Sequence, residues 1–131
     1  MVGCILLTHG DLGSGLKDTL EGIMGRQKGL MVISNVGMGK EELISALQQC
    51  SIDRGCEDGV VIFVDMFGTS CWQTAKKVAS NACGGQKKIA VITGVNLPML
   101  VKFFSLRDSL SVDELVPLLK QEGEAGIRIE S

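Results

Sequence analysis

His9 is the only histidine in the chain, and it directly follows a short apolar run that ends at Thr8. The next residues, from Gly10 to Gly15, are rich in glycine, so the imidazole lies where a buried strand is expected to open into a loop. Histidine has an ordinary pKa of about 6.5, which lets it act as a nucleophile, a base or a proton carrier near neutral pH. His9 is therefore our first candidate for a catalytic residue.

Asp65 is the second candidate, because it ends another apolar run that begins at Gly59. In an open parallel sheet, ligands bind at the carboxyl ends of the strands, where both residues are expected to lie. If the two strands are neighbours, the Asp65 carboxylate can accept a hydrogen bond from one ring nitrogen of His9. The other ring nitrogen would then keep a free lone pair, as a nucleophilic histidine requires.

A third feature follows Asp65, where Gly68, Thr69 and Ser70 lead into a predicted helix. The start of a helix offers unpaired backbone N–H groups and the positive end of a dipole, which favour a phosphate. The Ser70 hydroxyl could bind the same anion. Together with His9 and Asp65, these residues predict phosphoryl transfer through a phosphohistidine. The chain has no phosphate-binding loop of the G-x-x-x-x-G-K-[S/T] type, so we expect the donor to be another protein.

The elements that position these residues alternate between strands and helices, which predicts an α/β fold with a mainly parallel sheet. The apolar runs predict strands at 2–8, 30–34, 59–65 and 88–93. Helical spacing predicts helices at 13–24, 40–50 and 97–104. Two more helices are expected, one from Thr69 or Ser70 to before Gly84-Gly85 and one from Ser111 to about Glu122. The tail from Gly126 to Ile129 is expected to form a short edge strand.

The composition is that of a single soluble domain, because 45% of the 131 residues are hydrophobic and 21% are charged. We see neither a membrane span nor a secretory signal, so we expect a cytoplasmic protein. The five cysteines lack C-x-x-C spacing, so we expect reduced thiols rather than disulfides or a zinc cluster. Because the chain has one histidine, we do not expect a metal site, and we expect no cofactor. The balanced charge gives no support for nucleic-acid binding.

Three segments of the chain resemble the IIA domains of the mannose family of the bacterial phosphoenolpyruvate-dependent sugar phosphotransferase system. They are Thr8 to Gly10, Val64 to Ser70 and Gly94 to Leu100, and their order and approximate spacing are those of the family. Together they span nearly the whole chain, so the resemblance implies one such domain over residues 1–131. Many members of the family have a proline after the serine, where this chain has Cys71.

By this resemblance, His9 would accept a phosphoryl group from phospho-HPr on Nε2 and pass it to a IIB component. Asp65 would be the partner of Nδ1, and Ser70 would bind the phosphoryl oxygens. The family also implies a doubly wound sheet of strand order 2-1-3-4. It further implies a homodimer in which the C-terminal strand, here around Ile127 to Ile129, is exchanged between subunits.

Three other functions are compatible with the same residues. A phosphotransfer subunit that feeds dihydroxyacetone kinase would share the histidine site. A hydrolase could use Ser70, His9 and Asp65 as a triad, although the chain lacks a G-x-S-x-G motif around Ser70. A regulatory module could bind partners without any transfer, and its binding would not depend on His9.

Overall fold

The computed structural model describes residues 1–51, 56–81 and 87–131. Strands and helices alternate as expected until two helices follow one another at the C-terminal end. Their bounds are β1 Gly3–Thr8, α1 Leu12–Met24, β2 Leu30–Ser34, α2 Lys40–Ser51, β3 Val60–Val64, α3 Ser70–Asn81, β4 Ile89–Thr93, α4 Leu97–Leu106 and α5 Val112–Ala125.

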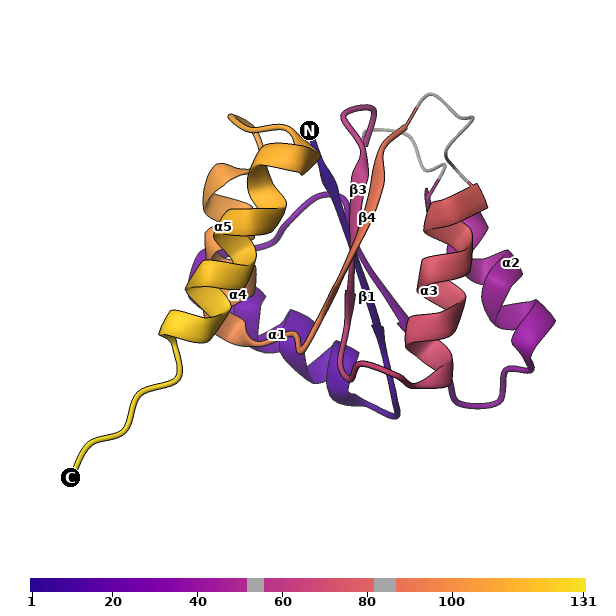
Figure 1. The fold of residues 1–131 in the computed structure, drawn as a ribbon, viewed down its shortest axis with the longest axis horizontal. Helices are drawn as coiled ribbons and strands as arrows, with labels where there is room; N and C mark the ends of the chain where they lie inside the picture. The colour runs from indigo at the N-terminus through magenta and orange to yellow at the C-terminus, as the bar shows by residue number, and fades with distance from the viewer. Residues whose placement is uncertain (52–55, 82–86) are drawn as a thin grey trace.

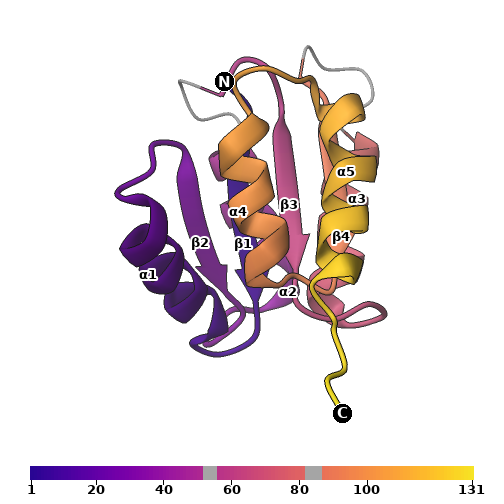
Figure 2. The same cartoon turned by 90° about the vertical axis from the view of Figure 1, so that its left-hand side faces the viewer.

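The four strands form one parallel sheet in the order β2-β1-β3-β4, which confirms the predicted fold class and topology (Figure 2). Leu7 of β1 pairs with Val64 of β3, and Thr8 pairs with Ser34 of β2. The carboxyl ends of the three strands are therefore level. Residues that directly follow them meet at one edge of the sheet.

Helices cover both faces of the sheet, with α1, α4 and α5 on one side and α2 and α3 on the other (Figure 1). Because both faces are covered, every residue of β1 and β3 is buried, which explains their continuous apolar sequences. Each layer has its own core. Helix residues in the first core include Leu20, Leu100, Phe103, Leu115 and Leu119, and those in the second include Leu43, Leu47, Ala75 and Val78.

The helix boundaries agree with the sequence where a side chain caps the helix. The predicted capping box of Ser111 and Glu114 is formed at the start of α5. The same helix ends later than expected, at Ala125. Gly123 lies inside it and packs against α4, since a Cβ at Gly123 would lie 2.8 Å from Cε of Met99. The predicted helix end near Gly84-Gly85, like Cys83, lies outside the described residues.

The C-terminal tail does not form the expected edge strand within its own chain. Residues 127–131 have no regular structure and lead away from the body of the molecule (Figure 1). Ile127 and Ile129 alternate as strand residues do, but a strand also needs a neighbour to pair its backbone groups. Ile129 is 92% exposed. In the described part of the chain, none of the helices is both long enough and apolar enough to span a bilayer.

Candidate functional site

The structure brings His9 and Asp65 into direct contact. Nδ1 of His9 lies 2.9 Å from Oδ2 and 3.0 Å from Oδ1 of Asp65. The backbone N–H of His9 donates a second hydrogen bond to Oδ2, at 2.9 Å. Asp65 thus holds both the ring and the main chain of His9. This contact follows from the topology, because β1 and β3 are neighbours and their carboxyl ends are level.

The electrostatics of the pair determine which ring nitrogen is available. Burial alone would raise the pKa of Asp65, but the hydrogen bonds from the backbone N–H and ring of His9 outweigh it and hold that pKa below its usual range. An ionised carboxylate can only accept hydrogen bonds, so Nδ1 must carry the proton. The lone pair of a neutral ring is therefore on Nε2. The His9 side chain is 40% exposed, so this ring is accessible from solvent.

The loop around His9 is held by residues for which the sequence predicted no role at the site. Thr8 is fully buried, and its Oγ1 accepts a hydrogen bond from the N–H of Gly13 at 2.7 Å, which ties the start of α1 to β1. A Cβ at Gly13 would lie 2.8 Å from that same oxygen, so only glycine fits there without a shift. Ser34 and Asn35, at the end of β2, hydrogen bond to the backbone of Gly10.

The N-terminus of α3 contains the three residues expected to hold an anion. Gly68 has a φ of +84°, which favours glycine at this turn. The Thr69 hydroxyl donates to the carbonyl of Met66 at 2.8 Å and accepts from the N–H of Trp72 at 3.4 Å, so it acts as the helix cap. Ser70 is the exposed first residue of α3. Within the described residues the hydrogen bonds of the His9 ring go to Asp65, and none joins the ring to Ser70.

Cys71 occupies the position where many members of the resembled family have proline. Its side chain is buried in the core between the sheet and α2 and α3. Burial raises the pKa of the Cys71 thiol, and the negative charge of Asp65 raises it further. Cys71 is therefore a neutral packing residue near the site.

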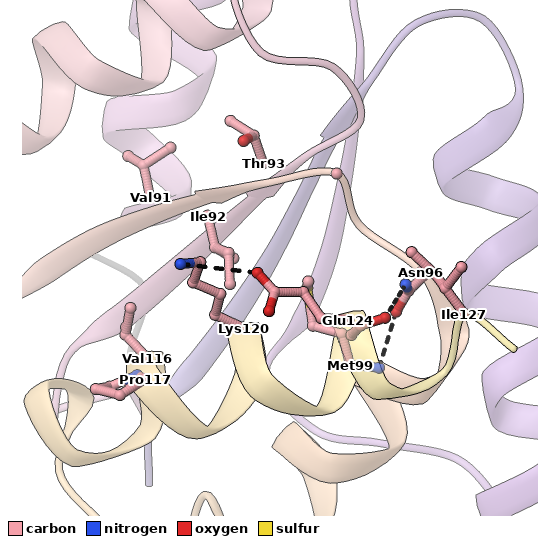
Figure 3. A pocket seen from close by; sticks show the side chains of 12 residues that line it. Val91, Ile92, Thr93, Asn96, Met99, Val116, Pro117, Lys120, Glu124 and Ile127 are labelled. Atoms are coloured by element: carbon pink, nitrogen blue, oxygen red, sulfur yellow. Dashed lines mark hydrogen bonds and ion pairs between the residues drawn. The ribbon is translucent and has the colours of Figure 1, made fainter.

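A cavity of about 660 Å³ lies away from His9, between β4, α4 and α5 (Figure 3). Its lining includes Val91 and Ile92 of β4, Val116 of α5 and Ile127 of the tail. The ion pair of Lys120 with Glu124 borders it. Its described lining includes none of the candidate residues His9, Asp65 and Ser70.

Comparison with known proteins identifies the family. A family model described as the PTS system fructose IIA component, EIIA-man, matches residues 3–119. The chain belongs to this family. It is 31% identical over 129 residues to the mannose-specific EIIAB component of Escherichia coli, covering 97% of this chain and 39% of that protein. It is 28% identical to the fructose-specific EIIA component of Bacillus subtilis, covering 98% of this chain and 86% of that protein.

Solved structures agree with this assignment. The crystal structure of phosphotransferase system component EIIA from Streptococcus agalactiae matches with a TM-score of 0.90 and 27% identity, covering 98% of this chain and 97% of that one. The chain spans about 39% of the length of the Escherichia coli relative. Membership of the EIIA-man family supports a phosphocarrier role in a sugar phosphotransferase system, as the sequence analysis predicted.

Proposed function

We propose that this protein carries a phosphoryl group on Nε2 of His9, between a phosphorylated donor protein and an acceptor protein. The observation that carries the proposal is the contact of Nδ1 with Asp65, at 2.9 and 3.0 Å. This contact fixes the tautomer and leaves Nε2 as the nucleophile. It also places a negative charge beside the positive charge that the ring gains when it forms a bond to phosphorus.

In the proposed reaction, the Nε2 lone pair attacks the phosphorus atom of the donor. A bond forms between Nε2 and phosphorus while the bond between phosphorus and the donor atom that carries it breaks, and that donor atom keeps the electron pair. The second transfer repeats the step with the acceptor as nucleophile. Atoms and charge balance without a nucleotide, a metal ion or a cofactor.

The phosphoryl oxygens are proposed to be held by the turn of Gly68, Thr69 and Ser70. Because the Thr69 hydroxyl already caps the helix, its contribution would come from the backbone. The first N–H groups of a helix have no partner within the helix, so those of Ser70 and Cys71 can donate to an anion. The exposed Ser70 hydroxyl can donate as well.

The donor is proposed to be phospho-HPr and the acceptor a IIB component. Five exposed apolar side chains support a protein partner, and they lie in the segments that follow β1, β2 and β3. We call them the apolar rim: Leu12, Val36, Met38, Met66 and Phe67. Phe67 is 68% exposed and packs against Trp72, with ring centroids 4.6 Å apart and the ring planes tilted by 52°. Apolar side chains gathered at one edge of a sheet are typical of a protein interaction surface.

The protein is further proposed to be a homodimer that exchanges its C-terminal tails. β4 is an edge strand of the described sheet, and its outer side borders the cavity of Figure 3. A tail from a second copy could pair with β4 and place its isoleucines against this apolar lining. Sedimentation of the full chain should give a dimer, and Ile129→Asp should give monomers. A monomeric wild-type protein would contradict the exchange.

A labelling experiment tests the proposed function. The protein is incubated with labelled phosphoenolpyruvate, enzyme I and HPr, and we expect one acid-labile phosphate per chain. His9→Gln, which keeps a polar side chain, should take up none. Label that persists in this variant would refute the assignment of His9. Adding either a IIB component or dihydroxyacetone kinase to the labelled protein then identifies the acceptor.

A further inference from the structure

The main chain directly after His9 is held by the end of the neighbouring strand β2. The hydroxyl of Ser34 donates to the carbonyl of Gly10 at 2.9 Å, and the Asn35 side-chain oxygen accepts from the N–H of Gly10 at 3.2 Å. The N–H of Asn35 also donates to the carbonyl of Thr8 at 3.3 Å. Two consecutive residues of β2 and its loop thus bind the backbone on both sides of His9.

These contacts matter because Gly10 has little to hold its conformation. Its φ is +56°, and a Cβ there would meet nothing within 4 Å, so packing does not restrain the turn. On the other side, the N–H of His9 is held by Asp65. The short segment that carries the imidazole is held by Asp65 after β3 and by Ser34 and Asn35 at the end of β2. The N–H of Leu12 also donates to the His9 carbonyl, at 3.4 Å.

We propose that Asn35, supported by Ser34, is a positioning residue for phosphoryl transfer, which keeps Nδ1 of His9 on Asp65 and so keeps Nε2 free. This inference rests on the proposed function. Since a backbone N–H can only donate, Oδ1 of Asn35 must face Gly10. Asn35 also borders a cavity of about 190 Å³ whose lining includes Ser70 and Lys40. Asn35 thus lines the same cavity as Ser70, the residue proposed to bind the phosphoryl group.

Asn35→Ala removes the acceptor of the Gly10 N–H and leaves Asp65 unchanged. Loss of one such hydrogen bond should lower kcat for phosphoryl uptake on the order of fivefold, with KM for the phosphorylated donor unaltered. Ser34→Ala should act in the same direction, and Ser34→Thr, which keeps the hydroxyl, should restore the rate. The control is Ser105→Ala, which removes a similar hydrogen bond to the Val101 carbonyl on α4 and should leave kcat unchanged.

A second measurement does not depend on transfer. Because the chain has a single histidine, the imidazole nitrogens of untagged, unphosphorylated protein give one set of NMR signals. At a pH where the ring is neutral, wild type should carry its proton on Nδ1, whereas Asn35→Ala should show a mixture of both tautomers. A stable variant with unchanged tautomer would overturn the inference, whatever its rate. If wild type takes up no phosphoryl group, the proposed function fails, while the tautomer comparison still tests the positioning.

Discussion

Asp65→Asn tests the central contact of the site with little change in shape. Three N–H groups converge on the Asp65 carboxylate, and they come from the His9 backbone, the His9 ring and the Met66 backbone. The carboxylate meets them with two acceptor oxygens, whereas asparagine has one oxygen and an NH₂ group that donates. At least one of the three donors would then face another donor.

The size of the effect follows from this count. Losing one hydrogen bond to a charged acceptor costs about 1.5 to 3 kcal/mol, which corresponds to a roughly 10- to 150-fold lower rate of phosphoryl uptake. The ring can avoid the clash by moving its proton to Nε2, but this would remove the nucleophile. Both routes slow the same step, so the effect should fall on kcat.

Rapid-quench measurement of label uptake by the purified variant gives this rate. Asp113→Asn is the matched control, because Asp113 is an exposed carboxylate that pairs with Lys88 at 3.5 Å, near the amino end of β4. It should be taken through the same assay and retain the wild-type rate. If folded Asp65→Asn keeps a rate within about threefold of wild type, the Asp65 contact does not determine the nucleophile, and our reasoning is wrong.

Four further predictions concern stability and can be measured by urea unfolding. The pKa of Asp65 is lowered in the folded protein, so its carboxylate should stabilise the fold above the ordinary carboxyl pKa of about 3.9. This stability should be lost as the pH falls through the folded pKa. The difference in free energy of unfolding between wild type and Asp65→Asn should therefore shrink in acid. Gly13→Ala should destabilise by about 1 to 3 kcal/mol, because its Cβ would lie 2.8 Å from the Thr8 hydroxyl. Gly15→Ala, in the same helix with nothing within 4 Å of a Cβ, should instead stabilise by about 0.5 to 1 kcal/mol. Ser111→Ala should cost about 0.5 to 2 kcal/mol through loss of the capping box, and an unchanged midpoint would contradict that role.

The sheet could be predicted from the sequence because its signals are local. Strands buried on both faces read as continuous apolar runs, and a helix cap is marked by its own side chain, as with Ser111. The contact of His9 with Asp65 needed one more step, the order of the strands. The resemblance implied the order 2-1-3-4, and the structure confirms it.

Other features depend on contacts that no local pattern records. The close packing of Gly123, inside α5, against Met99 joins two different helices. The tail has the alternation of a strand, yet it pairs with no other strand among the residues that the structure describes. The roles of Ser34 and Asn35 could have been suspected, since the rule about carboxyl ends applies to the strand that ends at Ser34 as well as to the other two.

The apolar rim has a consequence for how strongly partners would bind under different conditions. Burial of apolar surface gives association a negative heat-capacity change and makes it weaken on cooling, whereas salt screens it little. Contacts made mainly through Met66 and Phe67 would therefore respond to temperature more than to ionic strength. Titration calorimetry at several temperatures should show a binding enthalpy that becomes more negative as the temperature rises. At several salt concentrations it should show a nearly constant affinity.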